Sequence, residues 1–244
     1  MNQNLYKNAI NYYNSYKNES FVVKPSIPIL YFGNYEEYKI SEKKIITCAL
    51  NPSSIEFFNS ISNDINFRFH NNALNSSSDY FNSLNNYFIK NPYKRWFNSF
   101  EPILKGANAS FYSNLKYKNR VLHTDYCSIL ATSPTWSYLY NNQITSIFSE
   151  GSKLWYELVE YLQPDVILIS FARKYFKMIL NYYNKTNSQN IIMNLNNPRI
   201  AVEESIIRIG NKNTKLIFSQ GGRTPFMYLN ESKYSEKTNL GKML

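Results

Sequence analysis

Histidine and cysteine are scarce in this sequence. Its 244 residues include two histidines, His70 and His123, and two cysteines, Cys48 and Cys127. The chain therefore cannot assemble a multi-histidine metal site, or a four-cysteine zinc or iron–sulfur site, from its own residues. Only seven glycines occur, and they form neither a glycine-rich phosphate loop nor a nucleophile elbow. We therefore expect no metal and no organic cofactor.

Segments that would enter or cross a membrane are also lacking. No apolar run reaches the roughly 18 residues of a membrane span, and the N-terminus is polar, unlike a secretory signal. Cys48 and Cys127 lie within apolar runs, which favours two reduced thiols in a buried core. We expect a cytoplasmic protein that acts as a monomer.

Positive charge and aromatic side chains are abundant. The chain has 27 lysines and arginines against 17 acidic residues, so its formal net charge is +10 and its isoelectric point is near 9.3. Such a charge favours a polyanionic partner, either nucleic acid or an anionic membrane surface. Hydrophobic residues make up 43% and aromatic residues 17%, which is enough for a folded core.

Four short apolar runs predict strands that are covered on both faces. They are Lys44–Leu50, Arg120–Tyr126, Asp165–Ser170 and Lys215–Ser219. Helical spacing lies between them, over Asp79–Leu104 with a break at Asn91-Pro92, Ser152–Leu162 and Arg173–Tyr183. Ile200–Ile209 adds a strand or hairpin near a sheet edge. This order predicts an α/β fold, a three-layer sandwich around a central, four-stranded, mainly parallel sheet.

No repeat or linker divides the chain, so we expect a single domain over residues 1–244. Residues 1–28 are spaced as an N-terminal helical arm, and residues 79–110 as a helical insertion. Residues 231–244 are polar, and we expect them to fray.

Open α/β sheets bind ligands beyond the carboxyl ends of their strands, and four short segments stand there. The first predicted strand is followed by Asn51-Pro52-Ser53-Ser54, and the second contains VLHTDYC at residues 121–127. SFARKYF at residues 170–176 follows the third strand, and SQGGRTPF at residues 219–226 follows the fourth.

In order and spacing, these segments resemble the uracil-DNA glycosylase superfamily between about residues 44 and 226. CALNPSS is similar to its first motif, VLHTDYC to the strand whose asparagine reads the base, and KLIFSQGGRTPF to its last strand and DNA-wedging loop. QPDVILISFARKYFKMIL is similar to its proline-strand-helix segment. Three departures argue against plain uracil as the substrate. Ala49 and Ser53 replace motif glycines, Asp125 replaces the asparagine, and the final loop lacks the His-Pro-Ser text.

The resemblance implies that Asn51 is the catalytic residue. A neutral amide oxygen can hold a water below C1′ of the sugar while the bond to the base breaks. The alternative is an Asx-type turn residue that closes the strand. Ser53 and Glu56 have the spacing of a capping box, which predicts a helix start and favours a capping role for Glu56 over a catalytic one.

The substrate-binding candidates come from the first two segments and a nearby aromatic residue: Ala49, Pro52, Phe69, His123 and Asp125. A carboxylate only accepts hydrogen bonds, so Asp125 at the base-reading position suits the amino group of cytosine. Its alternative is a buried aspartate bonded to backbone or to an arginine. His123 projects to the same strand face as Asp125. It either contacts the residues around Asp125 or fills the core. Phe69 is the candidate wall for a flipped base, with Phe67 and Tyr80 as rivals.

The DNA-binding candidates are charged residues and a glycine-rich loop: Arg68, Lys94, Arg95, Gln220, Gly221, Gly222, Arg223 and Thr224. Gly221 and Gly222 allow backbone N–H groups to approach phosphate, and Arg223 adds charge there. The alternative is a flexible turn with a solvated arginine. Arg68 is a candidate phosphate contact. Lys94 and Arg95, beside Trp96, indicate either a nucleic-acid surface or a solvated helix face.

These features predict a monofunctional DNA glycosylase that hydrolyses the N-glycosidic bond of a flipped-out modified cytosine and leaves an abasic site. No lysine is placed by these motifs as a Schiff-base nucleophile, so lyase activity is not expected. DNA is the predicted partner, and no membrane is. Because bacteriophages carry modified cytosines, anti-phage defence is the corresponding role. The alternatives are a repair glycosylase for uracil or mismatched thymine, and a non-catalytic reader of modified DNA.

Overall fold

The computed structural model describes residues 2–59, 64–65, 68–69, 71–113, 116–185, 190–193, 201–229 and 234–244. Their contacts divide the chain into two compact units, each assembled from three segments. The first unit contains Met1–Tyr35, Ala49–Tyr93 and His123–Tyr161, and the second contains Glu36–Cys48, Lys94–Leu122 and Leu162–Leu244. The expectation of a single domain over residues 1–244 stays a prediction.

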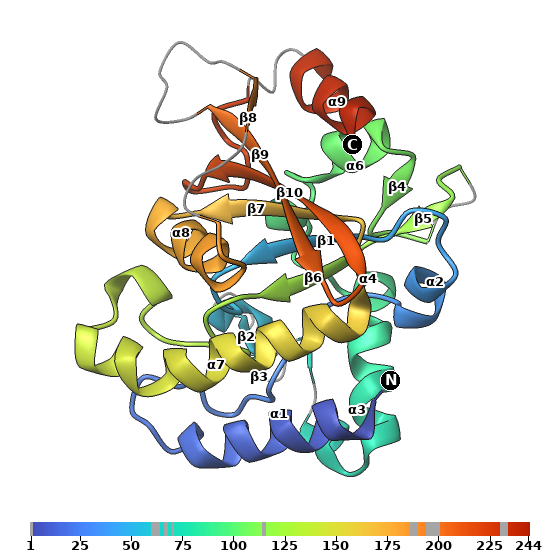
Figure 1. The fold of residues 1–244 in the computed structure, drawn as a ribbon. Helices are drawn as coiled ribbons and strands as arrows, with labels where there is room; N and C mark the ends of the chain where they lie inside the picture. The colour runs from blue at the N-terminus through green and yellow to red at the C-terminus, as the bar shows by residue number, and fades with distance from the viewer. Residues whose placement is uncertain are drawn as a thin grey trace. The chain divides into compact units, whose positions relative to one another are not determined.

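The largest sheet has six strands in the order β6-β1-β7-β10-β9-β8 (Figure 1). These are β1 (Ile45–Ala49), β6 (Leu122–Asp125), β7 (Val166–Phe171), β8 (Asn190–Met193), β9 (Val202–Ile209) and β10 (Lys212–Gln220). β1 and β10 pair with β7 in parallel, whereas β9 pairs antiparallel with β10 and β8 antiparallel with β9. The α/β class and the four strands predicted from apolar runs are therefore confirmed.

The expectation of a four-stranded, mainly parallel sheet is wrong, because the sheet is six-stranded and mixed. The strand predicted over Ile200–Ile209 is β9, and it leads into β10 through a tight turn at Gly210. Gly210 has a φ of 56°, a left-handed conformation that favours glycine. The antiparallel hairpin then pairs with β8, a four-residue strand too short to give a clear strand pattern of its own.

The central strands of the second unit are buried runs of β-branched and other apolar residues. β7 reads VILISF and is buried at every position but one. Helix α8 (Arg173–Tyr182), predicted over Arg173–Tyr183, packs on this sheet. Its Phe176 stacks on Phe218 of β10, with ring centroids 4.2 Å apart. A parallel sheet is normally covered by helices on both faces, and α8 provides such a helix here.

The C-terminal segment of the second unit packs as a helix. α9 (Tyr234–Met243) lies beside α6 (Glu101–Gly106) (Figure 1), and Leu240 is fully buried. A Cβ added to Gly241 would lie 1.9 Å from the carbonyl oxygen of Ile103, so the two backbones meet at this glycine. The expectation of fraying is therefore wrong for residues 234–244, because close backbone packing holds a segment whose sequence is polar.

The helical insertion is a series of short helices. α3 (Ser77–Asn85) and α4 (Tyr87–Lys90) belong to the first unit, and α5 (Lys94–Phe97) and α6 to the second. Asn91-Pro92 separates α4 from α5 as predicted, because proline disrupts a helix. The second unit also contains most of α2 (Tyr35–Lys39), and the parallel pair β4 (Ala109–Ser110) and β5 (Asn119–Arg120).

The first unit begins with the predicted N-terminal arm, helix α1 (Gln3–Tyr16). Tyr12 anchors this helix, because its hydroxyl lies 2.8 Å from both Ser128 Oγ and the carbonyl oxygen of Ile147. Ile147 belongs to α7 (Asn141–Leu162), which is longer than the predicted Ser152–Leu162. The remaining elements are η1 (Ser54–Glu56), β2 (Phe58–Asn59), β3 (Asp64–Ile65), η2 (Asn71–Leu74) and η3 (Trp136–Tyr138).

Two further expectations concern the thiols and the membrane. Cys48 and Cys127 are buried and free, so the prediction of two reduced core thiols is confirmed. Within the described part of the chain, every helix is too short or too polar to span a bilayer.

Candidate active site

The ends of β1 and β6 lie side by side in the first unit. The backbone N–H groups of Tyr126 and Cys127 donate 2.8 Å hydrogen bonds to the carbonyl oxygens of Ala49 and Leu50. Asn51 follows Leu50 directly, and Asp125 precedes Tyr126. The structure therefore brings the two strand-end segments together, as the sequence predicts, and places the two polar residues on neighbouring stretches of backbone.

The Asn51 amide is anchored through its nitrogen. Nδ2 lies 3.1 Å from the carbonyl oxygens of Pro52 and Leu130, and 3.0 Å from Oγ1 of Thr132. Two amide hydrogens thus serve three acceptors, which fixes the orientation of the side chain. Among the described residues, Oδ1 has no hydrogen-bond partner, and the side chain is half-buried. The amide therefore both closes the loop and presents an oriented acceptor that can hold a water.

Glu56 is buried, with 3% of its surface exposed. Its Oε2 accepts a 2.8 Å hydrogen bond from the Tyr87 hydroxyl and lies 3.5 Å from Nε of Arg68. Burial raises the pKa of Glu56 to about 7, and the nearby Asp125 charge raises it as well, while Arg68 and Tyr87 oppose both effects. A carboxyl group with this pKa can donate or accept a proton near neutral pH.

The capping-box expectation is half right. Ser53 accepts a 3.3 Å hydrogen bond from the N–H of Ile55, but the element that follows is a single 3₁₀ turn, η1, and not an α-helix. Glu56 points into the unit toward Tyr87 and Arg68, so the capping role favoured for it is wrong.

Arg68 is directed inward, with 8% of its side chain exposed. Its Nη1 donates a 2.9 Å hydrogen bond to the carbonyl oxygen of Ile55, and its guanidinium lies 5.6 Å from the ring centroid of Tyr93. A side chain so enclosed does not reach a DNA phosphate, which corrects that expectation. Its role here is to hold Glu56 and the turn that carries it.

Asp125 is the most isolated carboxyl group of the site. It is 2% exposed, and among the described residues neither of its oxygens has a partner within ordinary hydrogen-bond geometry. His123 lies on the same face of β6, as predicted, with Nε2 at 3.5 Å from Oδ1, a long contact. Burial raises the pKa of Asp125, and His123 opposes that rise. Two unfilled acceptor positions inside a protein are costly, which is typical of a site built for a ligand.

An aromatic cluster lies between Glu56 and His123. The ring of Phe69 stacks on Tyr87 with centroids 5.3 Å apart, and Phe32 contacts Tyr87, Phe69 and His123 at 4.8, 6.0 and 5.4 Å. Phe69 is buried, so its role as the wall of a base pocket stays a prediction. Its rival Tyr80 is a core residue whose hydroxyl accepts from the N–H of Leu30, and Phe67 lies outside the described residues.

The first unit therefore contains three buried polar groups, Glu56, Asp125 and Tyr87. The first two were considered separately in the sequence analysis, and the third was not identified there. Glu56 and Asp125 are both buried, and the charge of Asp125 is one of the causes that raise the pKa of Glu56, so ionising both carboxyl groups is unfavourable. Tyr87 was not among the predicted residues. The signal that could have indicated this cluster is the text IEFF, a lone acid among apolar residues.

The glycine-rich loop after β10 belongs to the second unit. The N–H of Gly221 donates a 3.0 Å hydrogen bond to the carbonyl oxygen of Phe171, and a Cβ at this position would lie 2.5 Å from Phe171 Cα. Gly222 is similarly close to Met227. The Gly221 N–H is thus used within the protein, which corrects its assignment to phosphate.

The other residues of this loop differ in burial and in hydrogen bonding. Gln220 accepts a 3.2 Å hydrogen bond from the N–H of Arg173, and Thr224 is half-buried. Arg223 is exposed, as a DNA contact requires, and so are Lys94 and Arg95 on α5. These residues and Asn51 belong to different units, so the convergence of Arg223 with Asn51 and Asp125 stays a prediction.

No group of three histidine, cysteine, aspartate or glutamate side chains arranged to hold a metal ion occurs among the described residues. No protein-family model matches the chain, and no curated protein matches it in sequence.

Proposed function

We propose that this protein is a monofunctional DNA glycosylase that hydrolyses the N-glycosidic bond of a flipped-out modified cytosine. The observation that carries the proposal is the Asn51 amide, whose nitrogen is held by three acceptors while its oxygen is left open beside the strand that bears Asp125. This is the arrangement that a water-holding residue needs, because the acceptor is fixed before the substrate arrives.

The reaction requires little further chemistry from the protein. As the bond between C1′ and the base breaks, positive charge develops on the sugar and negative charge on the departing base. A water held by Asn51 Oδ1 then adds its oxygen to C1′, and the net proton released ends on the base. Glu56, with a pKa of about 7, is a group that can relay that proton near neutral pH.

Asp125 supports the choice of base. Each of its oxygens has unused acceptor capacity, and an ionised carboxylate forms a charge-assisted hydrogen bond with an exocyclic amino group. Cytosine and its derivatives carry that amino group at C4, whereas uracil presents a carbonyl oxygen there. Normal cytosine must be spared, so the substituent at C5 decides which cytosine is released.

The net charge of +10 supports DNA as the partner. Bulky modified cytosines are a feature of bacteriophage DNA, and we propose defence against such DNA, in the cytoplasm, as the biological role. An abasic site left in an invading genome blocks its copying.

The test is to incubate the purified protein with matched DNAs that carry uracil, cytosine, 5-hydroxymethylcytosine or its glucosylated form, and to count abasic sites by alkaline cleavage. Release of a modified cytosine supports the proposal. Release of uracil or mismatched thymine alone identifies a repair enzyme, and tight binding of modified DNA without any release identifies a reader.

A further inference from the structure

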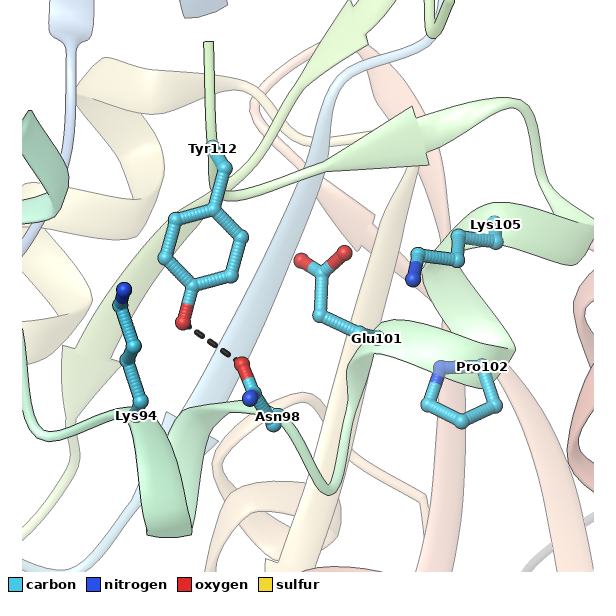
Figure 2. A pocket seen from close by; sticks show the side chains of 6 residues that line it. All are labelled: Lys94, Asn98, Glu101, Pro102, Lys105 and Tyr112. Atoms are coloured by element: carbon cyan, nitrogen blue, oxygen red, sulfur yellow. Dashed lines mark hydrogen bonds between the residues drawn. The ribbon is translucent and has the colours of Figure 1, made fainter. Parts of the chain in front are cut away.

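The second unit contains a pocket of about 430 Å³, whose lining residues lie between Asn51 and Asp125 in the sequence. Figure 2 shows the six side chains that line it: Lys94, Asn98, Glu101, Pro102, Lys105 and Tyr112. They come from α5, the turn between α5 and α6, the start and end of α6, and the segment that follows β4. Apart from Pro102, every lining side chain carries a polar or charged group.

The one carboxylate of the pocket is already occupied. Glu101 accepts hydrogen bonds from Ser110 Oγ at 3.1 and 3.0 Å and from the N–H of Phe111 at 3.0 Å. Glu101 is also largely buried. Its hydrogen bonds connect the start of α6 to Ser110 and Phe111. A cation entering the pocket would find few open acceptors.

The remaining polar groups are donors. Lys94 and Lys105 are exposed, and neither forms an ion pair among the described residues. Asn98 Oδ1 accepts a 2.7 Å hydrogen bond from the Tyr112 hydroxyl, as the dashed line in Figure 2 shows. Because that bond fixes the amide, Nδ2 of Asn98 becomes the open end.

The charge balance also favours an anion. The lining carries two ammonium groups and one internally bonded carboxylate, and Arg95 adds a further exposed cation on α5. Ammonium and amide donors around a small open pocket match the oxygen atoms of a phosphate group.

We infer that this pocket binds a phosphate group, supplied by the backbone of a nucleic acid, and that Lys94, Lys105 and Asn98 are its ligands. Phosphate as the ligand rests on the pocket alone, and DNA as its source rests on the proposed function. The inference adds Asn98 and Lys105 to the predicted DNA contact at Lys94, with Tyr112 orienting the Asn98 amide.

The test uses the full chain with Lys94 and Lys105 both replaced by Gln. Binding of a fluorescent DNA duplex is measured by anisotropy at several salt concentrations. We expect roughly tenfold weaker binding, equal for modified and unmodified DNA, and a salt slope smaller by about one, as for the loss of one phosphate contact. The matched control is Lys177→Gln, because Lys177 is exposed on α8 and does not line the pocket. It should leave both values unchanged.

Two further arms locate the source of the phosphate. Inorganic phosphate and a nucleoside monophosphate are titrated into the wild type, into the double variant and into Tyr112→Phe, which releases the Asn98 amide while keeping the ring. Weaker phosphate binding in the variant with unchanged DNA binding in the double variant would assign the pocket to a small phosphate compound. Unchanged binding of both DNA and phosphate in the double variant overturns the inference. Base release is measured separately at saturating DNA, so loss of the proposed function is distinguished from loss of this pocket.

Discussion

The hydroxyl of Tyr87 donates a 2.8 Å hydrogen bond to Oε2 of Glu56 in the buried interior of the first unit. Burial raises the pKa of Glu56 to about 7, although Tyr87 and Arg68 both favour its ionised form. The folded protein therefore keeps a proton on Glu56 at pH values at which the unfolded chain has released it.

We predict that Glu56 makes the protein less stable as the pH rises from about 4.5 to about 7. In this window the native state binds more protons at Glu56 than the unfolded state does, so the free energy of unfolding falls with pH. Glu56→Gln removes that titration. Relative to the variant, the wild type should lose roughly 1–3 kcal/mol between the two ends of the window, measured by urea unfolding. The exposed Glu19→Gln serves as control, and a pH-independent difference at Glu56 would contradict the prediction.

A second prediction distinguishes the role of the Asn51 amide oxygen from that of its amide nitrogen. Asn51→Ala should lower base release roughly 10²-fold or more at nearly unchanged DNA affinity, because it removes an oriented transition-state group. Thr132→Val removes one acceptor of the amide nitrogen and leaves the oxygen in place. It should lower stability by about 1 kcal/mol and lower base release less than tenfold. Equal base release by Asn51→Ala and the wild type would remove Asn51 from the mechanism.

The strands and the site differ in how far the sequence predicts them. Strands β1, β7 and β10 are predictable because buried parallel strands need continuous apolar runs. The pairing of the strand ends follows from that architecture, which is why Asn51 and Asp125 could be placed on neighbouring stretches of backbone. Glu56 could not be assigned, because its Ser-x-x-Glu spacing is a local signal and its burial depends on Tyr87, 31 residues away.

The same distinction applies to α9. Its sequence is polar, and local patterns predict fraying. The helix is held by the close approach of its backbone to α6 at Gly241. This is a tertiary contact, and a single glycine in the sequence does not indicate it. The phosphate role of Gly221 was misassigned for the same reason, since glycine is required there by Phe171 of the same unit.

A third prediction tests this packing. Gly241→Ala places a Cβ against the Ile103 carbonyl oxygen, a backbone atom that cannot move aside cheaply. We expect a loss of about 1–3 kcal/mol in unfolding free energy, although alanine has the higher helix propensity. Asn239→Ala, at an exposed position of the same helix, should not destabilise the protein. A Gly241→Ala variant as stable as the wild type would show that α9 packs differently.

The last prediction concerns Asp125, whose two oxygens are buried and, within the described part of the chain, have only the long contact with His123. If this carboxylate is kept for a ligand, it is a cost to the free protein, because a buried charge with no donors is unfavourable. Asp125→Asn should therefore raise the unfolding free energy at about pH 8 by roughly 1 kcal/mol or more while abolishing release of modified cytosine. Near pH 4 the gain should shrink, because burial raises the pKa of Asp125 and the protonated acid costs less.

Any remaining activity of Asp125→Asn should shift toward uracil, since an amide can donate to O4 where a carboxylate cannot. His123→Phe is the companion variant, because it removes the imidazole that lies 3.5 Å from Asp125 and leaves both carboxylate oxygens in place. A destabilised Asp125→Asn protein at pH 8 would instead make Asp125 a structural partner of His123, and the cytosine assignment would lose its support.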